Sequence, residues 1–174
     1  MKVFFLVLSF LVLSFNSFAL NLKSLAFVND GYIPDRYTCD SLNISPELEF
    51  SNVPEKTKSL VLICEDPDAS TGGWVHWIVF NISPMTTNFD EDIKKDAVLP
   101  DGALQGVNDF GETGYGGACP PAGKPHRYIF KLYALDTMLQ LEKTARKKDV
   151  KTAMIGHIIQ ETKLSGLYQR KITN

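Results

Sequence analysis

The sequence predicts a mostly β domain, a β-sandwich of antiparallel sheets with one or two C-terminal helices. Two observations carry this prediction. Short apolar or alternating runs are separated by turn residues such as Asn29-Asp30-Gly31 and Pro100-Asp101-Gly102, which is typical of an antiparallel sandwich. After Asp149 the apolar residues recur at the spacing of a helix rather than a strand.

The first half of the chain contains four expected strands, over Leu22–Val28, Glu47–Phe50, Ser59–Glu65 and Trp74–Ile82. Glu47–Phe50 alternates polar and apolar residues, as a half-buried strand does. Ser59–Glu65 is an almost continuous apolar run, which favours a buried strand. The residues between the last two strands, Asp66–Gly73, have the composition of a turn.

In the second half, Thr86–Leu99 is polar and is expected to be irregular, and Ala103–Asn108 is expected to form a short strand. Tyr128–Leu135 is rich in aromatic and β-branched residues, which favours a strand buried on both faces. We therefore expect this segment to lie in the centre of a sheet.

The C-terminal part predicts a helix that covers one side of the β core. Asp149 is the expected N-cap, Gly166 is expected to break the helix, and Leu167–Ile172 is the expected last strand. The residues that share the apolar face of this helix are Val150, Ala153, Met154, His157 and Ile158. His157 is interpreted as a packing residue of the helix.

The N-terminus has the layout of a secretory signal peptide over residues 1–19. Lys2 is followed by an apolar run to Phe15, and small residues precede a cleavage site after Ala19. The alternative is an uncleaved membrane anchor, but the run is shorter than the ~20 residues of a spanning helix. We therefore expect a periplasmic or secreted protein whose mature domain is residues 20–174, with no stable membrane insertion.

Charge and cysteine usage narrow the function classes. The formal net charge is −2 and there is no basic run, which argues against nucleic acid as a partner. Of the three cysteines, Cys64 lies in a predicted buried strand, whereas Cys39 and Cys119 lie in loops. A Cys39–Cys119 disulfide is the natural pairing in an exported protein, although the sequence alone allows the other two pairings.

A loop rich in glycine and proline precedes the strand Tyr128–Leu135, and it is the most informative stretch of the chain. Its composition excludes a helix or a regular strand, and it delivers Tyr115, His126 and Arg127 to the start of that strand. Loops on a rigid scaffold commonly carry binding residues. Four segments then look convergent: Asp66-Pro67-Asp68, Trp74-Val75-His76-Trp77, Gly114–Pro121 and His126-Arg127.

These segments resemble a known family. The pattern DPDASTG, WVHW and GYGGACPPAGKPHRYIFKLYALD is similar to that of the phosphatidylethanolamine-binding protein (PEBP) family, in its bacterial Raf-kinase-inhibitor-like branch. The secreted form of that branch also has a cysteine in each of two loops. The resemblance covers nearly all of residues 20–174. One departure is Ser70, where the family usually has proline.

The resemblance implies a small anion pocket at one end of a β-sandwich and no catalytic residues. The residues carried over to this pocket are Asp66, Asp68, His76, Tyr115, Gly117, Cys119, Pro120, Pro121 and His126. It implies a small phosphate-bearing or other anionic ligand, such as phosphoethanolamine, and regulation or inhibition of a protein partner such as a kinase or a protease. No cofactor and no metal are implied.

The residue types suit such a ligand. His76, His126 and the hydroxyl of Tyr115 can donate hydrogen bonds to a phosphate, as can amides of the glycine loop. Asp66 is expected to accept a hydrogen bond from a histidine and so orient it, and Asp68 to hold a turn or meet an ammonium group. Arg127 is expected to form a structural ion pair rather than to bind the ligand.

Three alternatives compete with an anion-binding protein. Two histidines and two aspartates could ligate zinc, although no closely spaced pair such as HxxxH is present. A hydrolase could use histidine and aspartate as acid and base, but the sequence contains no GxSxG motif and no evident nucleophile beside a histidine. A secreted effector or protease inhibitor could act through its surface loops.

Overall fold

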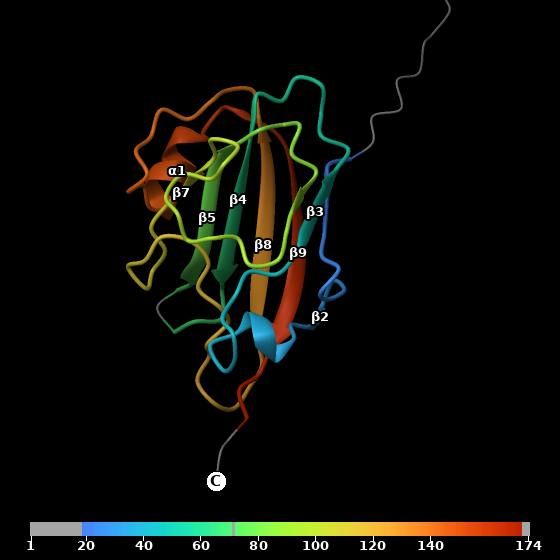
Figure 1. Ribbon diagram of the computed structural model, residues 1–174, viewed down its shortest axis with the longest axis vertical. Coiled ribbons are helices and arrows are strands. Elements are labelled where there is room, and N and C mark those ends of the chain that lie inside the picture. Colours follow the sequence, from blue (N-terminus) through green and yellow to red (C-terminus); the bar gives the residue numbers. More distant parts are fainter. Residues whose placement is uncertain (1–18, 71, 172–174) are drawn as a thin grey trace, which may run out of the picture.

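The computed structural model describes residues 19–70 and 72–171, which fold into two packed β-sheets (Figure 1). The small sheet has the strand order β1-β3-β6, and the large sheet has the order β2-β9-β8-β4-β5-β7. The small sheet contains β1 (Asn21–Lys23), β3 (Leu48–Ser51) and β6 (Asn88–Phe89). The large sheet contains β2 (Gly31–Tyr32), β4 (Ser59–Asp66), β5 (Trp74–Ile82), β7 (Leu104–Gln105), β8 (His126–Leu135) and β9 (Ile158–Tyr168). The predicted mostly β class is confirmed.

The centre of the large sheet is buried on both faces, as the apolar run in β4 predicts. Leu62 belongs to the core between the sheets, whereas its neighbour Ile63 belongs to a second core on the outer face. Successive side chains of a strand point to opposite faces, so one strand supplies both cores. β4 pairs antiparallel with β5 on one side and with β8 on the other.

Helix α1 (Lys147–Ala153) covers the outer core next to β5 (Figure 1). Val150, a residue of this helix, is completely buried. Asp149 is not the N-cap: Arg146 is, and the Asp149 carboxylate accepts the Arg146 backbone N–H at 2.9 Å in a capping box. A short 3₁₀ helix, η1 (Asp35–Tyr37), precedes the first cysteine.

The C-terminal helix is shorter than predicted and the last strand is longer and starts earlier. His157 lies in the turn after α1, and Ile158 begins β9. Gly166 lies within β9, opposite Tyr128 of β8, where a Cβ atom would approach the Ile33 side chain to 2.5 Å. The glycine therefore permits close packing between strand and loop. It does not end a helix, because the residues around it form β9, which pairs with β8 on one side and β2 on the other.

Other boundaries also differ from the prediction. The expected strand Leu22–Val28 is regular only over β1, and the expected strand Ala103–Asn108 only over β7. β6 lies inside the segment expected to be irregular. Each of these strands pairs with its neighbour over only two or three residues.

The predicted signal peptide lies outside the described residues, apart from Ala19 at its end. Across residues 19–70 and 72–171, no helix combines the length and the apolar character needed to cross a membrane.

Candidate functional site

A cavity of about 350 Å³ opens where β4 ends and where β5 and β8 begin. It is called the histidine cavity below. Its lining consists of Asp66, Asp68, Ala69, Ser70, Trp74, His76, Phe110, Cys119, Pro120, Pro121 and His126. Seven of the nine predicted pocket residues therefore meet here. A larger cavity, of about 620 Å³, lies beside β2 and the residues after β9, but no histidine lines it.

Asp66 and His126 form a close pair in the wall of this cavity. The Nδ1 atom of His126 lies 2.7 Å from Oδ2 of Asp66, and the side chains are 17% and 5% exposed. A carboxylate can only accept, so Nδ1 carries the hydrogen and Nε2 is left for a ligand. The other oxygen of Asp66 accepts the backbone N–H of Asp68 at 2.8 Å. The expected orientation of a histidine by Asp66 is thus confirmed.

Asp68 and Arg127 form a second pair at the rim. The guanidinium donates to both carboxylate oxygens, at 2.9 and 2.6 Å, and the backbone N–H of Arg127 donates to Oδ2 at 2.9 Å. The side-chain hydrogen bond to Arg127 is the main reason why the pKa of Asp68 falls to about 2. The predicted structural ion pair of Arg127 is confirmed, and Asp68 is the carboxylate that it holds.

His76 differs from its predicted role. Its Nδ1 atom lies 2.7 Å from the carbonyl oxygen of Gly116, which can only accept a hydrogen bond. Burial lowers the pKa of the ring, which is packed edge-on against Phe110 and Tyr128. His76 is therefore a neutral ring whose Nε2 atom accepts hydrogen bonds, rather than a donor that becomes charged at mildly acidic pH.

The glycine loop uses its amides internally. The N–H of Gly116 donates to the carbonyl of His76 at 2.8 Å, and the N–H of Gly117 donates to Oδ1 of Asn43 at 2.7 Å. A Cβ atom on Gly117 would lie 2.4 Å from that oxygen, so glycine is required by close approach between two loops. These two amides therefore hold the cavity wall in place and do not face an anion.

Tyr115 also lies outside the cavity lining, contrary to the prediction. Its side chain is 3% exposed, and its hydroxyl donates to the carbonyl of Tyr37 at 2.8 Å. Its ring packs edge-on against Trp77 in the core. The hydroxyl is thus already used to attach the glycine loop to the segment that carries Cys39.

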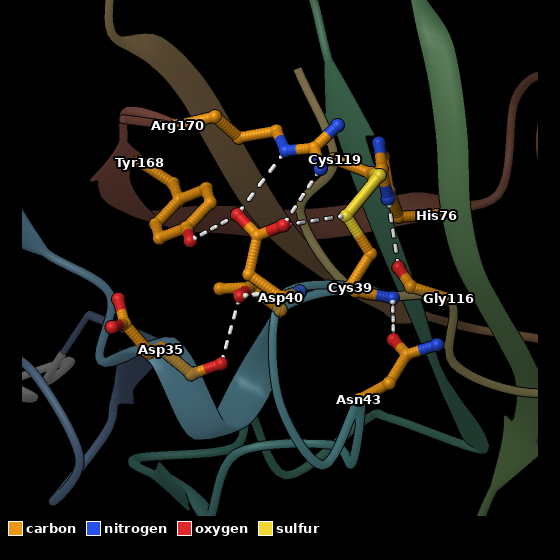
Figure 2. Close-up of a disulfide and its surroundings, with 11 residues drawn as sticks. Asp35, Cys39, Asp40, Asn43, His76, Gly116, Cys119, Tyr168 and Arg170 are labelled. Atoms are coloured by element: carbon orange, nitrogen blue, oxygen red, sulfur yellow. Dashed lines mark hydrogen bonds and ion pairs between the residues drawn. A yellow bond between two sulfur atoms is a disulfide. The ribbon is translucent and has the colours of Figure 1, made fainter. Parts of the chain in front are cut away.

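A disulfide joins the same two segments (Figure 2). Cys39 and Cys119 are bonded and Cys64 is free and buried, so the predicted pairing is confirmed. Beside the disulfide, the Asp40 carboxylate accepts the Tyr168 hydroxyl at 2.7 Å and pairs with Arg170 (Figure 2). Cys119 therefore lies in a cavity wall that is held from two directions.

Four residues of the lining were not among the predicted pocket residues: Ala69, Ser70, Trp74 and Phe110. Trp74 lies two positions before His76 on β5, so a strand period of two could have placed both on one face. Phe110 is positioned by Asn108, whose side chain accepts the N–H groups of Phe110 and Glu112. No local pattern indicates that contact. Ser70 was identified only as a departure from the family pattern.

His157 does not line the histidine cavity. It pairs with Asp136 at 2.8 Å, and the two side chains are 47% and 53% exposed. Its predicted packing role is therefore wrong, because the residue follows α1 and faces solvent. Within residues 19–70 and 72–171, no cluster of three histidine, cysteine or acidic side chains is arranged to hold a metal ion.

Comparison with known proteins gives concordant results. A family profile described as phosphatidylethanolamine-binding protein matches residues 23–169. A UPF0098 protein from Methanothermobacter thermautotrophicus is 55% identical over 145 residues, covering 83% of this chain and 95% of the relative.

Two solved structures share the fold. A putative PEBP homologue from Chlamydia trachomatis has a TM-score of 0.81 and 44% identity, covering 88% of this chain and 99% of that protein. YbcL from E. coli, described as a new member of the mammalian PEBP family, has a TM-score of 0.82 and 36% identity, covering 87% and 99%.

Proposed function

The chain belongs to the phosphatidylethanolamine-binding protein family, and we propose that it binds the phosphoryl group of a small ligand in the histidine cavity. The observation that carries this proposal is the pair of Asp66 and His126, joined at 2.7 Å in the cavity wall. The carboxylate fixes the hydrogen on Nδ1 and stabilises the charged ring. Protonated His126 then offers its Nε2–H to a phosphoryl oxygen as a charge-assisted hydrogen bond.

The remaining lining suits a small phosphoryl compound. Asp68 is neutralised by Arg127, so its charge does not act alone on an anion. Trp74 and Phe110 form an apolar wall, with ring centroids 5.4 Å apart, against which a short carbon chain can pack. A site this small and open to water should bind with an affinity between about millimolar and tens of micromolar.

The proposal is tested by titrating O-phosphoethanolamine into wild type, His126→Asn and His157→Asn, with NMR or calorimetry as the readout. Loss of a charge-assisted hydrogen bond should weaken binding at least about tenfold in His126→Asn. Equal affinity in wild type and His126→Asn, or loss only in His157→Asn, would place the site elsewhere.

We propose that the protein acts by binding rather than by catalysis. One observation favours a second candidate, a hydrolase: Ser70 lines the same cavity as Asp66 and His126. A serine nucleophile needs a base within hydrogen-bond reach, and among the described contacts no hydrogen bond joins Ser70 to a histidine. Turnover of p-nitrophenyl esters or phosphates that is lost in Ser70→Ala would establish the hydrolase instead.

We also propose export, on the basis of the signal-like residues 1–19 and the disulfide between Cys39 and Cys119. N-terminal sequencing of protein from the native host should find Leu20 first, whereas an intact Met1 would contradict cleavage.

Regulation of a kinase or protease partner is proposed to require the histidine cavity. An inhibitory activity that survives alanine substitution of both His76 and His126 would instead indicate action through the surface loops.

A further inference from the structure

In the histidine cavity a ligand meets hydrogen-bond acceptors as well as a hydrogen-bond donor. This combination restricts which ligands can bind. Nδ1 of His76 is committed as a donor to the Gly116 carbonyl at 2.7 Å. Figure 2 shows the second ring nitrogen turned away from Gly116. His76 is 3% exposed and lines the cavity, so a ligand that reaches this ring meets the lone pair of Nε2.

The surroundings of His76 keep that lone pair free. Burial is the largest influence and lowers the pKa of the ring. The backbone of Gly116 and Gly117 and the carboxylates of Asp66 and Asp109 act in the opposite direction with smaller effects. Phe110 and Tyr128 pack edge-on against the ring, at 5.3 and 5.1 Å between centroids, and exclude water from it.

Asp66 adds a second acceptor to the same wall. Each of its oxygens accepts one hydrogen bond, from His126 or from the Asp68 amide, and has room for one more. The buried Tyr128 hydroxyl, whose pKa is raised by burial and then by the charge of Asp66, lies against the same carboxylate as a competing donor. The side chain is 5% exposed, so unpaired contact with another anion would be costly there. A fully deprotonated oxyanion would accept a hydrogen bond from His126. Its other oxygens would face the lone pairs of His76 and Asp66 with no hydrogen between them, and this contact is repulsive.

We infer that the cavity selects a phosphomonoester in its singly protonated form, and rejects sulfate esters and phosphodiesters, which have no proton to donate at neutral pH. This inference rests on the proposed phosphoryl-binding function and names its ligand class. The P–O–H group donates to Nε2 of His76 or to Asp66, while another phosphoryl oxygen accepts from Nε2–H of His126. A free phosphomonoester therefore fits, whereas the phosphodiester of an intact phospholipid does not.

Three probes that share the same ammonium group test this inference. O-phosphoethanolamine carries the acidic P–O–H, ethanolamine O-sulfate carries no such proton, and glycerophosphoethanolamine is the diester. At about pH 6, near the second pKa of a phosphomonoester, O-phosphoethanolamine should bind about tenfold or more tightly than either other probe. Vesicles of phosphatidylethanolamine should fail to compete with it.

The pH dependence of the ratio isolates the ligand's proton. All three probes meet the same protein groups, so a change in the charge of the protein cancels in the ratio of affinities for O-phosphoethanolamine and ethanolamine O-sulfate. That ratio should fall up to about tenfold per pH unit above about 6, as the phosphomonoester loses its proton. A ratio that stays constant between about pH 6 and 8 would overturn the inference.

His76→Asn supplies the decisive variant. An asparagine amide can still donate to the Gly116 carbonyl, but its shorter side chain lacks the acceptor that Nε2 presents. Its selectivity for the phosphomonoester over the sulfate ester should fall by about tenfold, whereas His157→Asn should keep it. Equal binding of all three probes to wild type would overturn the inference and leave the proposed function standing. Binding of none of them would remove both.

Discussion

Within residues 19–70 and 72–171, two histidine–aspartate pairs have nearly the same length, and one of them lines the histidine cavity. His126 and Asp66 are joined at 2.7 Å, and His157 and Asp136 at 2.8 Å. The first pair has side chains that are 17% and 5% exposed, whereas those of the second are 47% and 53% exposed. The same two functional groups at the same distance therefore do not define a site; burial and neighbouring groups do.

The difference comes from where the backbone places each carboxylate. Asp66 ends β4, opposite Trp74 of β5, and its second oxygen is held by the Asp68 amide. Asp136 lies just beyond the end of β8, on a turn open to water. A charged pair in water is screened and contributes little to stability, whereas the two charges of a partly dehydrated pair interact more strongly.

The largest expected effect concerns the Cys39–Cys119 disulfide, which lies in the wall of the histidine cavity and not beside the exposed pair of His157 and Asp136. The Cys39→Ser, Cys119→Ser double variant should lose about 2–4 kcal/mol in free energy of unfolding, measured with urea, because the disulfide closes a long loop. A reductant should reproduce this loss in wild type and add nothing to the double variant. If reductant leaves the stability of wild type unchanged, the bond between Gly117 and Asn43 suffices to hold the two loops together.

A smaller effect is expected when the carboxylates of Asp66 and Asp136 are removed one at a time. Asp66→Asn should lower the free energy of unfolding by about 1–3 kcal/mol, because it removes a charged acceptor from a buried hydrogen-bonded pair. Asp136→Asn should change it by less than about 0.5 kcal/mol, because that pair is exposed. Urea denaturation of the two variants and wild type provides the measurement. Equal losses in both variants would show that burial does not distinguish the pairs.

The rim pair of Asp68 and Arg127 should contribute less than Asp66, and only above acidic pH. The pKa of Asp68 falls to about 2 in the folded protein, below about 3.9 in an unfolded chain. Its stabilisation is therefore fully present above about pH 4 and disappears as pH falls through about 2. Wild type and Arg127→Gln should differ in unfolding free energy at neutral pH and converge in acid. A difference that persists or grows in acid would contradict this linkage.

The smallest expected effect is that of removing the exposed histidine. The free energy of unfolding of His157→Asn should lie within about 0.5 kcal/mol of that of wild type, because both members of its pair are hydrated. Its affinity for O-phosphoethanolamine should equal that of wild type. A clear loss of either property would mean that the exposed pair acts on the cavity through the strand that follows it, β9.

Local patterns predicted the parts of this structure that local forces decide. The apolar runs of β4, β5 and β8 have almost the predicted bounds, because such runs must be buried wherever they lie. The loop positions of Cys39 and Cys119 predicted their disulfide. The C-terminal helix was misplaced because apolar residues at its end satisfy a helical and a strand period at once, and pairing of β9 with ten residues of β8 decides between them.

The sequence by itself determined the β class, the candidate pairing of the cysteines, and the four segments that meet at one end. Only the tertiary structure decided which polar atoms of those segments remain for a ligand. Tyr115 and the amides of Gly116 and Gly117 have the right chemistry, but neighbouring loops already use them. His76 becomes an acceptor because the Gly116 carbonyl occupies Nδ1 and burial lowers the pKa of the ring, which leaves the lone pair on Nε2. Hydrogen-bonding capacity belongs to a residue type, but its availability depends on contacts made across distant parts of the chain.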